Sequence, residues 1–175
     1  MITIRKERPP DTAAREALLD EAFGKLRWRK SSQRLRNGRP PAEGLAFVAT
    51  DGKRVVGTTR LWTISCGTGK PALLLGPVAV AAGYRNRGIG AALVSHAISE
   101  SRRLGHTAII LVGDATYYGR FGFSAEKTAA LRMSGPFERH RLLGLELLPG
   151  ALDGACGLLR ARTHPAEAVL AASAA

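Results

Sequence analysis

The sequence has 175 residues, of which 45% are hydrophobic and 23% charged, with a formal net charge of +12, values typical of one folded domain. The longest apolar stretch, residues 71–82, is shorter than the roughly 20 residues that cross a bilayer. Charge from Arg5 onward interrupts any secretion signal, so we expect a cytoplasmic protein without a membrane segment. Two cysteines alone form neither a disulfide framework nor a metal site, and we expect no metal.

Basic residues are concentrated in one block near the N-terminus. Arginine supplies 20 of the 26 basic residues, and residues 25–39 contain seven basic residues and no acid. Such a surface attracts phosphorylated cofactors, acidic substrates or nucleic acid, although the charge by itself favours a surface that merely keeps the protein in solution. No aromatic series, helix-turn-helix or zinc spacing accompanies the block. Nucleic-acid binding is therefore an alternative rather than the first hypothesis.

The first third of the chain is predicted to contain a strand, two helices and a hairpin. Asp11 is a candidate N-cap, and the apolar residues after it have helical spacing. The dipeptide Asp51-Gly52 favours a hairpin because both residues tolerate positive φ. The expected elements are a strand over 2–5, a helix after Asp11, a short helix from Ser31 or Ser32 to Gly38, and strands over 45–50 and 54–65.

The middle third has the pattern of a βαβ unit. Residues 72–80 are apolar on both faces, as in a central strand, and Gly76-Pro77 within them predicts a bulge because proline cannot donate to the ladder. A turn over 83–90 leads into a helix that ends near Leu104 and has one apolar side. Residues 108–112 read as a second buried strand, parallel to the first.

The last third is predicted to add a short helix and further strands. Asp114 is well placed to cap a helix through Tyr118, and the strands are expected over 127–133, 142–148 and, weakly, 155–160. We therefore expect a single domain over residues 1–162, followed by a flexible tail at 163–175.

Gly88 and Gly90 lie where a strand leads into a helix. Backbone N–H groups and the helix dipole favour an anion there, and Arg85 and Arg87 add full charge. A plain turn is the alternative. The dinucleotide-binding motif would need a glycine at Leu93, and a P-loop would need Gly-Lys-Ser/Thr, so neither nucleotide motif fits.

A third phosphate-binding pattern does fit. Arg85-Asn86-Arg87-Gly88-Ile89-Gly90 resembles the Arg/Gln-x-x-Gly-x-Gly/Ala signature of the GNAT superfamily of acetyl-CoA-dependent N-acetyltransferases. Val78-Ala79-Val80 stands where that family has its cofactor-binding strand, and residues 118–123 are similar to its Tyr-x-x-x-Gly-Phe element. The resemblance covers roughly residues 2–148.

The resemblance implies both a fold and a reaction. The fold is mixed α/β: a central mixed, mostly antiparallel sheet flanked by helices, with one parallel βαβ unit at about 72–112. The reaction is direct transfer of the acetyl group of acetyl-CoA to a primary amine of a small molecule or protein in a ternary complex. The implied cofactor-binding residues are Val78, Ala79, Val80, Arg85, Asn86, Arg87, Gly88, Ile89, Gly90 and Ala91.

The family also implies how these residues act. The strand at 78–80 would splay from the strand at 109–112, and the pantetheine arm would complete the sheet like an added strand. An N–H near Val78 would stabilise the oxyanion that develops on the thioester carbonyl. Tyr118 matches the usual general acid, which protonates the departing thiolate. A core tyrosine is the plainer alternative, and it suits Tyr117 better.

No general base is apparent, since residues 73–80 contain no acid; Glu43, Glu126 or Asp114 could relay a proton through water. This gap leaves two alternatives to the enzyme: a catalytically weak acetyl-CoA-binding sensor, and a basic nucleic-acid-associated protein. The expected partner is an amine substrate, and the positive charge favours one with an anionic group. Exposed sheet edges could pair in a homodimer.

Overall fold

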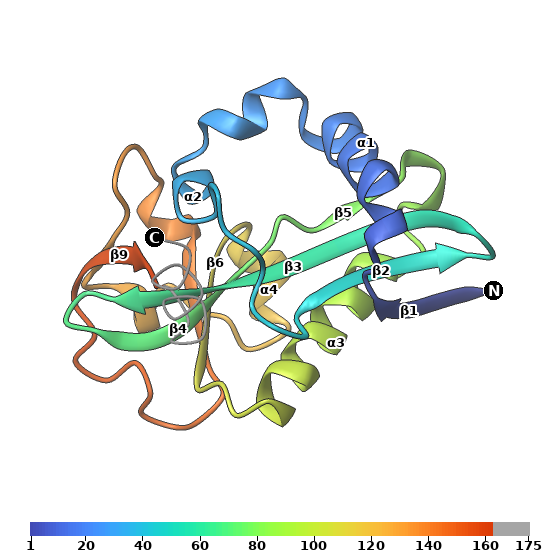
Figure 1. Ribbon diagram of the computed structural model, residues 1–175. Coiled ribbons are helices and arrows are strands. Elements are labelled where there is room, and N and C mark those ends of the chain that lie inside the picture. The colour runs from blue at the N-terminus through green and yellow to red at the C-terminus, as the bar shows by residue number, and fades with distance from the viewer. Residues whose placement is uncertain (163–175) are drawn as a thin grey trace, which may run out of the picture.

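The computed structural model describes residues 1–162, and within them a mixed sheet is flanked by helices (Figure 1). The strands are β1 (Ile2–Lys6), β2 (Ala46–Asp51), β3 (Arg54–Cys66), β4 (Lys70–Leu75), β5 (Ala79–Val80), β6 (Ala108–Val112), β7 (Leu131–Arg132), β8 (Leu142–Glu146) and β9 (Gly157–Ala161). The helices are α1 (Thr12–Phe23), α2 (Ser31–Arg34), α3 (Ile89–Arg103) and α4 (Ala115–Gly119).

The sheet runs in the order β1-β2-β3-β4-β6-β8, with β5 and β9 also paired to the long strand β3. The β4–β6 pair is parallel and α3 connects its strands, which confirms the predicted βαβ unit. The short β7–β9 pair is also parallel, and the other pairs are antiparallel. The predicted mixed α/β class is therefore confirmed.

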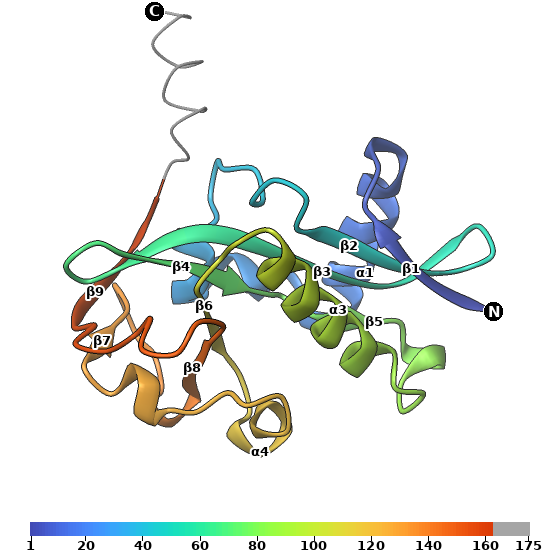
Figure 2. The same ribbon diagram turned by 90° about the horizontal axis from the view of Figure 1, so that it is seen from below.

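Helices cover both faces of the sheet. Figure 1 shows α1 and α2 above the strands and α3 below them, and Figure 2 shows α3 in front of the strands with α1 behind. Helix α3 follows its predicted pattern, because Ile89, Leu93 and Val94 are buried in the core. Leu104, expected on the same apolar side, is instead 40% exposed just after the helix ends.

The predicted bulge at Gly76-Pro77 is present. The Gly76 N–H donates a hydrogen bond to the carbonyl of Arg60 on β3 (2.9 Å), and Ala79 is paired with Thr58 on the same strand. Two residues along β3, from Arg60 to Thr58, therefore correspond to three residues along the other segment, from Gly76 to Ala79. The β4–β5 side thus contains one extra residue, which is the definition of a bulge. It divides the single strand expected over 72–80 into β4 and β5.

Two N-terminal predictions need correction. Asp11 precedes α1, but its carboxylate does not cap that helix; it accepts hydrogen bonds from the Arg5 guanidinium (2.6 and 2.8 Å) and from the Arg8 N–H (2.8 Å). The helix expected from Ser31 to Gly38 is only one turn, Ser31–Arg34, and the segment before it forms an unexpected 3₁₀ helix, Lys25–Arg29.

The prediction of one strand over residues 127–133 was also wrong. Residues Glu126–Thr128 form a 3₁₀ helix, and only Leu131–Arg132 are extended. The Thr128 hydroxyl donates to the carbonyl of Leu142, and the Arg139 guanidinium binds the carbonyls of Thr128, Ala129 and Leu131. These side chains take the backbone acceptors that a strand partner would use.

Two smaller differences concern the end of the chain. Strand β8 ends at Glu146 instead of residue 148, because the N–H groups of Leu147 and Leu148 both donate to Thr107. The weak last strand is shifted to Gly157–Ala161. The predicted tail, 163–175, lies outside the described residues. In the part of the chain that is described, no helix has the length and hydropathy needed to span a membrane.

Candidate active site

Strands β4 and β6 separate at the centre of the sheet. They are paired only at Leu73–Ile109 and Leu74–Ile110, and beyond this point β5 turns toward β3 while β6 continues along β8. The bulge at Gly76-Pro77 lies at the point of separation. A gap therefore opens between β5 and the end of β6.

Backbone groups of the bulged segment face this gap. The Ala81 N–H donates to Val56 of β3 (2.9 Å), and Ala79 is paired with Thr58. Because successive residues of a strand direct their backbone groups to opposite sides, those of Val78 and Val80 point away from β3. An extended chain of amides lying in the gap would find donors and acceptors there.

A cavity of about 540 Å³ fills the gap. Residues 75–78 form one wall, residues 111–114 form the other, and Ser31, Ser32 and Glu138 close the side of the first helices. This gap cavity is large enough for the reactive end of one ligand together with a second small molecule.

Tyr118 borders the gap cavity from α4. Asp114 caps α4 as predicted, since its carboxylate accepts a hydrogen bond from the Tyr117 N–H at 2.7 Å. The Tyr118 ring packs edge-on against Phe123 and covers Gly113. Burial, with a smaller contribution from Tyr117, raises the pKa of the Tyr118 phenol to about 12, so the hydroxyl stays protonated at neutral pH.

The predicted anion-binding loop is exposed at the N-terminus of α3. Residues 85–88 are exposed, and Gly88 adopts φ +76° just before the first helical residue, a conformation that favours glycine. The first N–H groups of a helix lack intrahelical acceptors, so the start of α3 presents donors to solvent. A β-carbon on Gly90 would lie 3.3 Å from the Tyr117 hydroxyl, which places this helix end beside α4.

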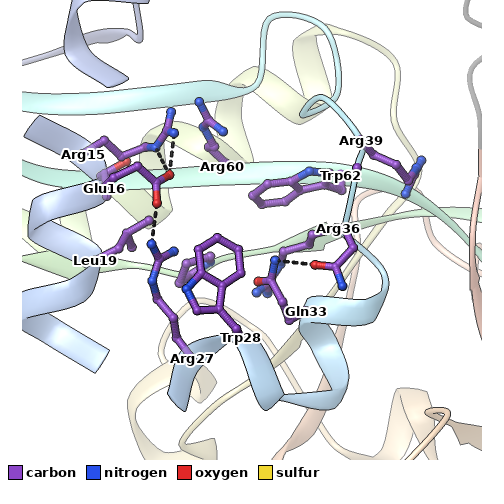
Figure 3. Close-up of a pocket in the computed structure, with 14 residues that line it drawn as sticks. Arg15, Glu16, Leu19, Arg27, Trp28, Gln33, Arg36, Arg39, Arg60 and Trp62 are labelled. Atoms are coloured by element: carbon purple, nitrogen blue, oxygen red, sulfur yellow. Dashed lines mark hydrogen bonds and ion pairs between the residues drawn. The ribbon is translucent and has the colours of Figure 1, made fainter. Parts of the chain in front are cut away.

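A second, smaller cavity lies beside the first, between α1, the segment 25–39 and β3 (Figure 3). Its volume is about 210 Å³, and it shares Arg36 and Pro77 with the gap cavity. Its walls include both tryptophans of the chain, Trp28 and Trp62. We call it the arginine cavity because five arginines border it: Arg15, Arg27, Arg36, Arg39 and Arg60.

Most of these arginines are already paired. Arg15 and Arg60 bind Glu7, and Arg15 and Arg27 bind Glu16. Arg27 also bonds to Asp20 at 2.9 Å. Arg39 donates to the carbonyl of Leu35 (2.8 Å) and to both oxygens of Thr63.

Arg36 is different, because no hydrogen bond or ion pair joins its guanidinium to any other described residue. Its Nε is buried without a partner, and its guanidinium carbon lies 5.2 Å from the centre of the Trp62 ring. Burial lowers the pKa of Arg36 to about 10, so the group still carries its charge at neutral pH. The indole Nε1 of Trp62 is likewise buried without an acceptor.

Comparison with known proteins identifies this architecture. A GNAT acetyltransferase domain model matches residues 42–125. The Escherichia coli K12 N-acetyltransferase YhbS is 30% identical over 168 residues, which cover 92% of this chain and 96% of YhbS. The chain belongs to the GNAT family of N-acetyltransferases. It is an acyltransferase.

Solved GNAT structures support this assignment. YhbS from E. coli in complex with CoA has 28% identity and a TM-score of 0.78, over 92% of this chain and 89% of that one. A GNAT acetyltransferase from Brucella melitensis in complex with acetyl-CoA has 28% identity and a TM-score of 0.67, over 95% and 98% of the two chains. These relatives bind CoA or acetyl-CoA.

The predicted donor-site residues lie on two neighbouring segments, since a β-carbon on Gly90 would lie 3.7 Å from the Val80 side chain. Val78, Ala79 and Val80 form the bulged segment, and residues 85–91 form the loop before α3 and the first residues of that helix. Within this group the side chain of Ile89 is buried in the core, so only its backbone faces the loop. Tyr118 stands across the gap from Val78.

The candidate bases are not brought together. Asp114 borders the gap cavity, but its carboxylate already caps α4. Glu43 lines neither cavity, and Glu126 borders a separate pocket near Cys156. Sequence reasoning missed Glu138, an acid that does border the gap cavity, and it missed the unpaired state of Arg36. The lack of an acid near Arg36 in the sequence was the available signal.

Proposed function

We propose that this protein transfers the acetyl group of acetyl-CoA directly to the nitrogen of a primary amine while both molecules are bound. The observation that carries the proposal is the meeting of two cavities at the β4–β5 bulge, where they share Arg36 and Pro77. One cavity occupies the gap where a donor chain would complete the sheet, and the other opens from the side of the first helices. An amine and a thioester can therefore meet without an acyl-enzyme intermediate.

The donor side is served by backbone groups and two arginines. The N–H groups at the start of α3, with Arg85 and Arg87, are suited to the pyrophosphate of CoA. The backbone groups of Val78 and Val80 are suited to the pantetheine amides and to the thioester carbonyl. When bound, acetyl-CoA supplies an activated acyl group on a thiol leaving group.

Tyr118 would protonate the departing sulfur. Its phenol faces the gap cavity, and its raised pKa keeps the proton available across the physiological range. A thiol has a pKa near 8.5, so this proton transfer assists the reaction without being indispensable. An acceptor that arrives as the neutral amine needs no strong base in the site.

The acceptor side is polar and positively charged. Ser31 and Ser32 border the gap cavity, and Lys30 and Arg141 add charge to it. This environment suits an amine that carries an anionic group rather than a polyamine. Trp62 borders the neighbouring arginine cavity, whereas Ser124 bridges to Gly144 and borders neither cavity.

Calorimetric titration with acetyl-CoA, followed by a screen of amines with detection of free CoA thiol, tests the proposal. We expect saturable one-to-one binding and amine-dependent release of CoA. Folded protein that does not bind millimolar acetyl-CoA would contradict the donor site. Binding without transfer to any amine would instead identify an acetyl-CoA-binding sensor.

A further inference from the structure

Arg36 Nε and Trp62 Nε1, on two side chains that line the arginine cavity, are buried hydrogen-bond donors without an acceptor. Buried donors in native proteins are almost always paired, so each such exception points to a missing partner. The two side chains lie in contact, with the guanidinium carbon over the indole ring at 5.2 Å. A ligand with two acceptor atoms close together can satisfy both donors.

The charge balance around this pair favours an anion. Arg15, Arg27 and Arg60 are compensated by Glu7, Glu16 and Asp20, and Arg39 donates to backbone carbonyls and to Thr63. Arg36 is left as an uncompensated guanidinium beside Trp62 in the wall of the cavity (Figure 3). A planar guanidinium fork binds a carboxylate with two parallel hydrogen bonds.

The position of Arg36 limits the distance between this anion and the reacting amine. A β-carbon on Gly76 would lie 3.8 Å from Arg36 Nη2, so the guanidinium lies beside the bulge. The backbone of Val78, two residues further on, faces the gap in which the thioester is proposed to lie. A carboxylate held by Arg36 is thus only a few bonds from the amine that attacks the thioester. An α-amino acid has this spacing.

The remaining walls select the side chain of that amino acid. Trp28, Trp62 and Leu19 form an apolar, largely aromatic patch in a wall that is otherwise polar. Its volume of about 210 Å³ is below the roughly 300–1,000 Å³ of cavities that take drug-sized ligands. One aromatic or large aliphatic side chain fits this space, with stacking against the indoles.

We propose that the acceptor is a free α-amino acid with an aromatic or large apolar side chain, whose carboxylate binds Arg36 and the indole N–H of Trp62. This inference rests on the proposed function. The neutral α-amino nitrogen forms the new N–C bond, and the C–S bond of the thioester breaks. The nitrogen loses one proton to solvent, the sulfur gains one from Tyr118, and Tyr118 recovers its proton from solvent.

Tryptophan fluorescence tests the carboxylate site without any reaction, because both tryptophans of the chain line this cavity. The probes are 3-phenylpropionate, which has the carboxylate but no amine, and its neutral amide. We expect a saturable fluorescence change with the carboxylate and binding about 10- to 100-fold weaker with the amide, the loss typical of one charged hydrogen-bond pair. Equal binding of the two probes, or binding of neither, overturns the proposal.

Variants then assign the effect to Arg36. Arg36→Met should remove the preference for the carboxylate probe. Arg29→Met is the matched control, because Arg29 is exposed in the same basic segment and lines neither cavity. If Arg36→Met unfolds at the wild-type temperature and still prefers the carboxylate probe to the amide, the assignment to Arg36 is contradicted. The comparison of the two probes on wild-type protein remains a test even if Arg36→Met does not fold.

Kinetics separate this inference from the proposed function. With saturating acetyl-CoA, wild-type protein should acetylate L-phenylalanine with a kcat/KM about 10- to 100-fold above that for 2-phenylethylamine, which lacks only the carboxylate. Faster acetylation of the decarboxylated amine overturns the inference and leaves the acetyltransferase intact. Acetyl-CoA binding without acetylation of either amine, or of any other, overturns both.

Discussion

The ring of Tyr118 lies against the backbone of Gly113, so closely that a β-carbon on Gly113 would be 2.4 Å from Tyr118 Cε2. Gly113 follows β6, and Tyr118 lies on the short helix α4 that Asp114 begins. The contact therefore ties the proposed acid to the wall of the gap cavity. Any side chain at position 113 must displace the phenol.

Replacing Gly113 with alanine should lower kcat while leaving the affinity for acetyl-CoA nearly unchanged. Contacts below 3.0 Å require the ring to move, and a displacement of about 1 Å in a catalytic group can cost about 10²-fold in rate. Gly119→Ala is the control, since a β-carbon there has no atom within 4 Å. Equal kcat values for the two variants would show that the close contact does not position Tyr118.

Removing the Tyr118 hydroxyl should lower kcat by about 10²-fold, the lower end of the range for general acids, because a thiolate leaves readily. Burial raises the phenol pKa to about 12, so wild-type kcat should not fall between pH 7 and pH 10 through loss of this proton. The measurement is the pH profile of kcat for wild type and Tyr118→Phe, with binding of acetyl-CoA followed in parallel. An unchanged rate in the variant removes Tyr118 from the proposed role.

The elements that form the proposed donor half of the site could be predicted from the sequence because their signals are local. The turn before α3, the buried strands on either side of it, and Asp114 capping α4 all depend on residues a few positions apart, and the structure contains each of them. The bulge could also be predicted from local sequence, because Pro77 has no N–H to donate to a neighbouring strand, whatever the position of the distant parts of the chain.

The acceptor half could not be predicted in the same way, because its contacts join distant segments. The block of residues 25–39 reads as an exposed basic surface, yet Arg27 folds inward onto Glu16 and Asp20 of α1. Arg36 meets Trp62 of β3 and the bulge at Pro77 only in the folded chain. Charge composition cannot tell a compensated arginine from an uncompensated one, and this difference decides where an anion binds.

Replacing Gly88 with glutamate should weaken acetyl-CoA binding at least about tenfold. The substitution places a negative charge among the N–H donors at the start of α3, where the helix dipole favours anions. Gly105→Glu is the control: it has a similar positive φ (+81° against +76°), equally open surroundings, and lies beyond the opposite end of α3. Calorimetry should show weakened binding only for Gly88→Glu. Equal affinities would place the pyrophosphate elsewhere.

Replacing Asp11 with asparagine should lower the free energy of unfolding at pH 7 by about 1–3 kcal/mol, the range for charged hydrogen bonds. The Arg5 guanidinium, helped by the Arg8 N–H, lowers the pKa of the Asp11 carboxyl to about 2. Because the folded pKa is depressed, this stabilisation is complete above the ordinary value of 3.8 and is lost as the pH falls toward 2.

Urea unfolding of wild type and Asp11→Asn at several pH values between 7 and 2.5 measures this difference. The gap between the two proteins should be constant above about pH 5 and should narrow steadily below about pH 4. Glu21→Gln is the control, because it removes the same charge from an exposed position on α1. A gap that stays constant down to pH 2.5 would mean that Asp11 stabilises the fold by packing rather than by its ionised contact with Arg5.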